Sequence, residues 1–278
     1  MKLSSIRTSA TPLRALVVGA ITALVLSTGC AGPGYAEPAP DPNMLFETDF
    51  NGPDGSPPGG PWEIDAGAGG WGNNEVQTYT AASDNVRQDG QGHLVISART
   101  APNGAVTSAR ITTHNSFSFT YGRAEARISL PGGRGLHPAF WLLGSDVDQV
   151  GWPESGEIDV IETINDVPDF HTGVHAPADG SPRGQEVSAG GPSPVPLFGE
   201  FHTYWVERTP GKIVTGIDGI TLFTVTPADL QGNSRWVFDK PFHLLLNLAV
   251  GGNWPGPTDA STPNPAEMLV DWVRVRKL

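Results

Sequence analysis

Residues Gly122–Leu130 read GRAEARISL, and this stretch indicates the fold class of the chain. Every second residue is apolar, and the residues between them are charged or polar. Because successive side chains of a β-strand point to opposite faces, a period of two predicts a strand with one buried and one exposed face. The stretch therefore predicts a sheet whose inner face packs against another layer.

Similar short runs recur along the chain and are separated by turn-forming residues. The 278 residues include 35 glycines and 26 prolines, and no long helical periodicity follows the N-terminal region. Many short strands with turn signals between them predict an all-β sandwich or jelly roll. We see no repeats and no second domain boundary, and we expect one domain over residues 44–278. The other candidate strands are Leu45–Phe50, Val76–Thr80, His93–Arg99, Ala139–Leu143, Glu157–Thr163, Thr203–Glu207, Phe242–Val250 and Met268–Arg276.

The N-terminal residues 1–30 have the pattern of an export signal. Lys2, Arg7 and Arg14 precede an apolar run over residues 15–26, which is shorter than the roughly 20 residues of a membrane-spanning helix. Residues 31–43 are rich in Pro, Gly and Ala and predict an extended tether. We therefore expect an exported protein.

Two processing routes fit this signal. In the first, residues 26–30 form a lipoprotein signal, and lipidated Cys30 anchors the protein to the outer face of a membrane. In the second, cleavage after Ala36 releases an extracellular protein. Cys30 is the only cysteine, so no disulfide can form within the chain and the fold must rest on its core.

The charge balance narrows the range of partners. The formal net charge is −12, and residues 1–30 contribute cations only. Because binding to a phosphate backbone requires a basic surface, nucleic acid is not an expected partner. Contact with a membrane is expected only through the lipid anchor, and a monomer is the default oligomeric state.

In Glu154–Thr163, which reads ESGEIDVIET, the three acids Glu157, Asp159 and Glu162 are interleaved with aliphatic residues. Glu157 and Asp159 are two residues apart and share one face of a strand. Strict alternation would place Glu162 in the core, where an unpaired charge is very costly. A β-bulge at Val160–Ile161 shifts the alternation by one residue and returns Glu162 to the face of the other two acids.

Two carboxyl groups on one face suit the hydrolysis of a glycosidic bond. A retaining glycosidase holds them about 5–5.5 Å apart, one to attack the anomeric carbon and one to protonate the leaving oxygen. We expect burial and nearby negative charge to raise the pKa of the acid, Glu162. A solvated acidic edge strand and a cation site are the alternatives for the same residues.

Residues Trp152–Glu162 resemble the signature of glycoside hydrolase family 16 in the bulged form typical of laminarinases. The resemblance covers nearly the whole mature chain. It implies a β-jelly roll of two curved antiparallel sheets with an open substrate cleft, and retaining hydrolysis of β-1,3-glucans such as laminarin. The other matching stretches, which follow in the family's order, are Gly72–Thr80, Tyr121–Arg127, Pro138–Gly144, Leu246–Gly256 and Val270–Val275.

The resemblance also implies roles for single residues. Glu157 would be the nucleophile, Asp159 its helper and Glu162 the acid/base. For the tryptophans among the cleft positions, packing in the core is the alternative, and Arg123 has pairing with Glu125 as its alternative. The positions that match the lining of the family's cleft are Asn73, Arg123, Trp141, Trp152, His175 and Trp254.

Other residues matter less for the chemistry. Many family members bind a structural Ca²⁺, and Asp271 matches the side chain involved, with backbone oxygens near Glu47 and Gly92 as partners; an ordinary strand acid is the alternative. No cofactor is required for the chemistry. We expect His171 and His202 to be structural hydrogen-bond partners.

Three departures from the family pattern concern the substrate. His137 stands where laminarinases often have a tryptophan, Ala176 follows His175 where an aromatic is common, and residues 178–197 are Pro/Gly-rich and irregular. These departures leave open another polysaccharide, such as a mixed-linkage glucan or a galactan. Transglycosylation and a non-catalytic carbohydrate-binding module also remain as alternatives.

Overall fold

The computed structural model describes residues 41–278. The predicted signal segment, Cys30 and residues 31–40 of the predicted tether lie outside the described residues, so these predictions stay untested. Within residues 41–278, no helix combines the length and the apolar character needed to cross a membrane.

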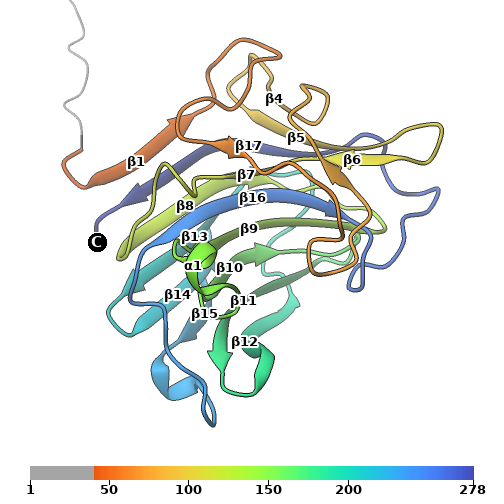
Figure 1. Ribbon diagram of the computed structural model, residues 1–278. Helices are drawn as coiled ribbons and strands as arrows, with labels where there is room; N and C mark the ends of the chain where they lie inside the picture. Colours follow the sequence, from red (N-terminus) through yellow and green to blue (C-terminus); the bar gives the residue numbers. More distant parts are fainter. Residues whose placement is uncertain (1–40) are drawn as a thin grey trace, which may run out of the picture. The chain divides into compact units, whose positions relative to one another are not determined.

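One sheet contains seven strands, which lie in the order β12-β11-β10-β9-β16-β7-β2 with antiparallel pairing throughout (Figure 1). Only three of these strands, β9, β10 and β16, coincide with predicted runs. The bounds are β2 (Glu63–Ile64), β7 (Arg110–Thr112), β9 (Leu136–Gly144), β10 (Glu157–Glu162), β11 (Asp169–Ala178), β12 (Ser181–Pro192) and β16 (Phe242–Val250).

The other sheet contains ten strands along the path β15-β14-β13-β8-β17-β5-β6-β3, with β1 paired to β17 and β4 to β5. Its pairs are antiparallel except β3 with β6. A four-residue helix α1 (Val147–Val150) and a 3₁₀ turn η1 (Pro227–Asp229) complete the described elements. The strands are β1 (Met44–Asp49), β3 (Thr78–Tyr79), β4 (Val86–Gln88), β5 (Leu94–Thr100), β6 (Val106–Ser108), β8 (Gly122–Ser129), β13 (His202–Thr209), β14 (Lys212–Ile217), β15 (Ile220–Val225) and β17 (Ala266–Arg276).

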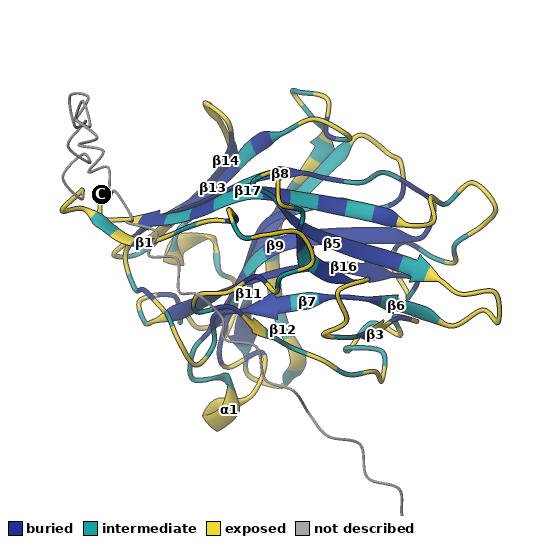
Figure 2. Ribbon diagram, turned by 90° about the horizontal axis from the view of Figure 1, so that it is seen from above, coloured by how far each residue is buried: buried dark blue, intermediate teal, exposed yellow. Residues whose placement is uncertain are grey.

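Apolar side chains of both sheets form one core. In β8, Ala124 and Ile128 are fully buried, as the alternation in Gly122–Leu130 predicts. From the seven-stranded sheet, Phe140, Ile158 and Leu246 join the same cluster. Figure 2 shows the strands largely in the colour of buried residues and the loops at their ends as exposed. The all-β prediction is confirmed, and each large apolar side chain in this core contributes about 1.5–3 kcal/mol by its burial.

The bulge predicted in the carboxylate strand is confirmed. Against β9, Asp159 pairs with Trp141 and Ile161 pairs with Phe140, so Val160 is the extra residue. Against β11, the register shifts between Asp159 and Glu162. Both Val160 and Ile161 are fully buried in the core, and the three acids of β10 therefore share the opposite face of the sheet.

The prediction that residues 178–197 are irregular is wrong, because most of this segment forms β12. This strand pairs with β11 from Ser181 to Pro192 and lies at the edge of its sheet. Proline and glycine are tolerated at an edge, where one row of backbone groups faces solvent. Gly184 has a φ of 64°, and a Cβ there would overlap the carbonyl oxygen of Ala176, so the glycine permits the close approach of β11 and β12.

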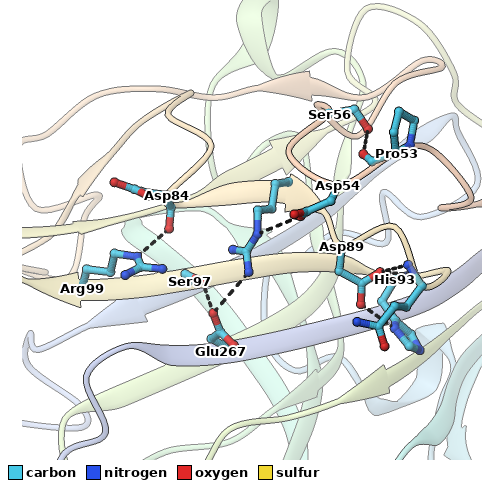
Figure 3. A network of polar contacts seen from close by, with 11 residues as sticks. Pro53, Asp54, Ser56, Asp84, Asp89, His93, Ser97, Arg99 and Glu267 are labelled. Carbon is cyan, nitrogen blue, oxygen red and sulfur yellow. Dashed lines mark hydrogen bonds and ion pairs between the residues drawn. The ribbon is translucent and has the colours of Figure 1, made fainter.

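A polar network crosses the face of the ten-stranded sheet that points away from the core (Figure 3). Arg87 of β4 lies 3.7 Å from Asp54 and 3.9 Å from Glu267 of β17. Ser97 of β5 donates a 2.8 Å hydrogen bond to Glu267. The network thus connects three neighbouring strands to the loop that holds Asp54, although such half-exposed ion pairs add only about 0–1 kcal/mol each.

Arg208 of β13 is a buried cation that holds loop carbonyls. Its side chain is 1% exposed and donates to the backbone oxygens of Phe119 at 2.8 Å, Phe238 at 2.7 Å and Lys240 at 2.8 Å. The guanidinium also lies 4.4 Å from the ring centroid of Phe242. Burial lowers the pKa of Arg208 to about 9, and the three carbonyls offset part of the desolvation.

We expect Arg208→Met to lower the free energy of unfolding by roughly 3–5 kcal/mol, because it leaves three carbonyl oxygens without a donor. Urea denaturation measures this change. The matched control is Arg235→Met, whose side chain is 54% exposed and lies 3.7–3.8 Å from its acidic partners; it should change stability by less than about 0.5 kcal/mol. Equal effects of the two substitutions would contradict the role given to Arg208.

Candidate active site

The three acids of β10 line one cavity on the face of the seven-stranded sheet opposite the core. Its volume is about 180 Å³. β10 lies between β9 and β11, so the alternative of an acidic edge strand is excluded. The lining residues come from five strands and from the segment before β3: Trp71, Asn73, Glu75, Tyr79, Arg110, His137, Ala139, Trp141, Glu157, Asp159, Glu162 and Asn247.

Strand β9 supplies the floor beside the acids. Its residues His137, Ala139 and Trp141 alternate onto the cavity face, and Ala139 lies directly opposite Glu162. The small side chain of Ala139 keeps the floor low next to that carboxylate. Trp141 donates from Nε1 to Oδ1 of Asn247 at 2.7 Å, which fixes the plane of its indole.

A second group of polar residues surrounds Trp141. The guanidinium of Arg110 lies 4.8 Å from the ring centroids of both Trp71 and Trp141. The amide of Asn247 donates to the hydroxyl of Tyr79 at 3.2 Å. Arg110 therefore brings a fixed positive charge to the wall of a cavity that is otherwise rich in carboxylates.

Glu157 and Asp159 form a largely buried pair of acids. Burial and the charge of Asp159 raise the pKa of Glu157 to about 8. Burial and the charge of Glu162 raise the pKa of Asp159 to about 6. Two like charges close together in a low dielectric repel each other strongly. Glu157 and Asp159 therefore titrate as a pair, and the second of their two protons leaves only at unusually high pH.

His175 of β11 lies against this pair. Its Nε2 is 3.4 Å from Oδ2 of Asp159 and 3.8 Å from Oε1 of Glu157. Burial lowers the pKa of His175, but the hydrogen bond and charge of Asp159 outweigh it and raise the pKa to about 10. An imidazolium at this place compensates the negative charge and holds both carboxylates in position. The ligand atoms of Glu157, Asp159 and His175 all lie within 4.8 Å of one another. Among residues 41–278, this is the group of side chains that could hold a metal ion.

The expectation that the pKa of Glu162 is raised is wrong. Burial raises it, but the hydrogen bond from His137 and the nearby histidine charges lower it further, so that the pKa lies below its ordinary value. The His137 Nε2 atom is 2.8 Å from Oε1 of Glu162. The sequence comparison with laminarinases noted His137 only as a departure, and the structure places it in direct contact with the candidate acid.

Five of the six predicted cleft residues lie at or beside the cavity. Asn73 and Trp141 line it, and His175 contacts two of its acids. Trp152 is 41% exposed, and its ring centroid is 5.9 Å from that of His175. Trp254 is 39% exposed and lies beside the other end of the acid row. Core packing, the alternative for these tryptophans, therefore does not describe Trp152 or Trp254.

The ring of Trp254 packs edge to face against two histidines. Its centroid is 5.0 Å from that of His137 and 4.7 Å from that of His171. His171 therefore contacts the wall of the cleft. His202, expected to be structural, lies in the other sheet and contacts Oδ2 of Asp218 at 2.8 Å through Nδ1.

The prediction that Arg123 lines the cleft is wrong. Arg123 belongs to β8 of the ten-stranded sheet, and its neighbour Ala124 faces the core, so the arginine points away from both core and cavity. It forms 2.7 Å ion pairs with Glu125 and Glu207 and stacks over Trp205 at 4.1 Å. Pairing with Glu125 was the alternative stated for this residue.

Asp271 also lies in the ten-stranded sheet, on β17. Oδ2 accepts a 2.6 Å hydrogen bond from Nη1 of Arg127, so a guanidinium occupies the place next to this carboxylate. The calcium prediction stays untested.

Several cavity residues were not singled out from the sequence. Arg110 is the first residue of the short strand β7, which the sequence pattern did not predict. Glu75 lies inside a matched stretch and accepts from Nε2 of Gln77 at 2.6 Å; burial raises its pKa. His137 could have been found from alternation alone, since it stands two residues before Ala139 and four before Trp141 in one strand.

The model of the family described as "Glycosyl hydrolases family 16" matches residues 73–274. The chain belongs to this family. Membership in this family identifies the protein as a glycoside hydrolase. The acids that the bulge in β10 brings to one face agree with this identification. The jelly-roll fold of the family agrees with the two sheets described above.

Several named relatives of this family 16 glycoside hydrolase are β-glucanases. The chain is 39% identical over 271 residues to a β-glucanase of Rhodothermus marinus, covering 91% of this chain and 93% of that protein. The solved structure of the laminarinase from Rhodothermus marinus gives a TM-score of 0.76 at 36% identity, with coverage of 84% and 97%. The catalytic domain of an endo-1,3-β-glucanase from Thermotoga petrophila RKU-1 gives 0.74 at 34% identity, with the same coverage.

The raised pKa of Glu157 predicts that this acid destabilises the fold in alkaline solution. Its pKa in the folded state, about 8, lies above the ordinary 4.5, so the favourable protonated state is present at low pH and is lost as the pH rises through 8. Glu157→Gln cannot ionise. We expect it to be more stable than the wild type at pH 9 by at least about 1 kcal/mol, with the difference shrinking toward pH 5.

Urea denaturation at both pH values tests this prediction. The control is Glu154→Gln, three residues earlier, whose side chain is 47% exposed and lies outside the cavity. Its effect on stability should be the same at pH 5 and pH 9. A Glu157→Gln protein less stable than the wild type at pH 9 would contradict the electrostatic description of the acid pair.

Proposed function

We propose that this family 16 enzyme is a retaining endo-β-1,3-glucanase that cleaves laminarin-like β-glucans by double displacement. One observation carries the proposal: the bulge in β10 brings Glu157, Asp159 and Glu162 to one cavity. Laminarinases and endo-1,3-β-glucanases among the relatives support the choice of β-1,3-glucan.

The first displacement forms a glycosyl-enzyme ester. The ionised carboxylate of Glu157 bonds through one oxygen to the anomeric carbon while the glycosidic bond breaks, and the leaving oxygen takes a proton from Glu162. Asp159 and His175 hold the nucleophile together, since His175 lies 3.8 Å from Oε1 of Glu157 and 3.4 Å from Oδ2 of Asp159. The positive charge on His175 balances the second carboxylate of the pair until the ester forms.

The second displacement releases the enzyme. Glu162, now a carboxylate, takes a proton from water, and the water oxygen attacks the anomeric carbon. The bond to Glu157 breaks, and its carboxylate returns. Two inversions at one carbon give net retention of the β configuration.

Aromatic and polar side chains around the acids would bind the sugar chain. Trp152 and Trp254 present half-exposed indoles near opposite ends of the acid row, where the apolar face of a pyranose ring can stack. Arg110 and Asn247 line the cavity and carry donors for hydroxyl groups.

Hydrolysis of laminarin by the wild type, Glu157→Ala and Glu162→Ala tests the proposal, with product sizes measured by chromatography. Removal of the nucleophile should abolish release of oligosaccharides, and removal of the acid/base should lower kcat about 10²–10⁴-fold. With a dinitrophenyl β-glycoside of a laminarin oligosaccharide, whose leaving group needs no proton, azide should rescue both variants with opposite stereochemistry: an α-glycosyl azide from Glu157→Ala and a β-glycosyl azide from Glu162→Ala. Glu154→Ala, outside the cavity, should keep wild-type activity.

Other outcomes would select the alternatives. Cleavage of a mixed-linkage glucan or a galactan but not of laminarin would keep the mechanism and overturn the choice of substrate. Early products longer than the substrate would indicate transglycosylation. Binding without cleavage of any polysaccharide would indicate a carbohydrate-binding module.

We also propose that the enzyme acts outside the cytoplasm, anchored through lipidated Cys30; the support comes from the sequence of residues 1–30. The mass of the N-terminal peptide from the membrane fraction of an exporting bacterial host should correspond to a chain that begins at lipidated Cys30. Cys30→Ser should move the protein out of that fraction. An unmodified wild-type chain that begins at Glu37 would rule out the anchor.

A further inference from the structure

His137 makes the closest side-chain contact of the candidate acid. It stands on β9, two residues before Ala139, which lies opposite Glu162. Its Nε2 is 2.8 Å from Oε1 of Glu162, and the residue is 8% exposed. A hydrogen bond of this length between largely buried groups fixes the carboxyl group, which lines the cavity.

The other ring nitrogen of His137 indicates which tautomer the neutral ring adopts. Nδ1 is buried and has no hydrogen-bond partner among the described residues. A buried N–H without an acceptor costs about 1–3 kcal/mol, so a neutral ring carries its proton on Nε2 and leaves Nδ1 bare. His137 is then a donor to Oε1, and Glu162 is the acceptor.

Packing holds the ring in this orientation. The indole of Trp254 meets the His137 ring edge to face at 5.0 Å and the His171 ring at 4.7 Å. His137 therefore has a packed neighbour on one side and the carboxyl group of Glu162 on the other. His171 shares the tryptophan contact but has no hydrogen bond to Glu162 in the described part of the chain, which makes it a matched comparison.

We propose that His137 is a positioning residue for Glu162, and that the two side chains act as one acid/base unit that shares a single exchangeable proton. This inference rests on the proposed role of Glu162. The exchangeable proton lies on the imidazole ring in the ion-paired form of the unit and on Oε2 of Glu162 in the reactive form. In the reactive form, Nε2–H of His137 donates to Oε1, and Oε2 carries the proton that goes to the leaving oxygen. Glu162 then becomes a carboxylate, and the bond from His137 becomes charge-assisted and stronger.

The second displacement reverses these changes. Oε2 of Glu162 accepts a proton from the attacking water, and the hydrogen bond from His137 weakens again as the carboxyl group becomes neutral. The proton on Nε2 stays in place in both steps. His137 therefore favours the transition state of protonation without contacting the sugar, because its hydrogen bond is strongest when Glu162 carries negative charge.

The surroundings of the unit favour retention of its proton. Burial lowers the pKa of His137, but the hydrogen bond and charge of Glu162 raise it above the ordinary value. The charged or titratable groups that face the unit are Glu75 before β3, Arg110 on β7, Glu157 and Asp159 on β10, and His171 and His175 on β11. The negative charges of the acids on the cavity side favour the protonated form of the pair His137 and Glu162. The pair therefore loses its last proton at a higher pH than either side chain would alone.

The pH dependence of kcat/KM tests the shared proton. His137→Gln keeps an N–H donor near the position of Nε2 but cannot ionise. We expect it to retain activity within about 10-fold of the wild type, and its alkaline limb to lie at lower pH. His171→Gln removes a contact of Trp254 but leaves the hydrogen bond between His137 and Glu162, so it should shift the alkaline limb much less than His137→Gln does. An unchanged limb in His137→Gln would overturn the proposal.

Dependence on the leaving group tests the positioning role. A dinitrophenyl β-glycoside of a laminarin oligosaccharide needs no proton on its leaving oxygen, whereas laminarin does. His137→Ala should lower kcat/KM on laminarin roughly 10–100-fold, the effect of one hydrogen bond to a charged group, and change it less than about 3-fold on the aryl glycoside. Equal losses on both substrates would mean a merely structural residue.

Glu162→Ala, measured on the same two substrates, separates this inference from the proposed function. If Glu162→Ala shows no difference between laminarin and the aryl glycoside, the acid/base assignment itself fails. If Glu162→Ala shows the difference and His137→Ala does not, only the inference about His137 fails.

Discussion

A carboxylate cannot remain unpaired in an apolar core, and β10 carries three acids within six residues. The extra residue at Val160 resolves this conflict, because it lets Ile158, Val160 and Ile161 all face the core while the acids face the cavity. The remaining features of the site follow from that one irregularity. Ala139 and Trp141 meet the acids from β9, and His175 meets them from β11, only in the register that the bulge produces.

Several acids close together in a largely buried cavity make each other's negative charge unfavourable, and other side chains partly offset this repulsion. Histidines contact the acids at both ends of the row, His175 near Glu157 and His137 at Glu162. The two acids nevertheless respond differently, since the pKa of Glu157 is raised and that of Glu162 is lowered. Which acid carries a proton therefore depends on the charges of its neighbours in the row and not on its own burial alone. A site of this kind trades stability for reactivity.

Local pattern predicted most of the frame and part of the site. Phe242–Val250 forms β16 with the predicted bounds, and the bulge could be derived from the core's intolerance of charge at Glu162. The local pattern failed where a structure depends on pairing with residues far away in the sequence. Residues 181–192 form a strand because β11 lies beside them, despite their glycines and prolines. Alternation correctly placed Arg123 on the polar face of a strand. Whether that face belongs to the sheet with the acids depends on the topology of the whole domain, which the local pattern does not contain.

The proposed double displacement requires Glu157 to be the nucleophile on the shared face that the bulge creates. Incubation with a 2-deoxy-2-fluoro laminarin-type glycosyl fluoride, followed by proteolysis and mass spectrometry of the peptides, tests it most directly, because the fluorine slows hydrolysis of the ester. We expect one glycosyl adduct per chain, on the carboxyl group of Glu157. An adduct on Glu162, or turnover of the natural substrate with no covalent adduct at any time, would contradict the account.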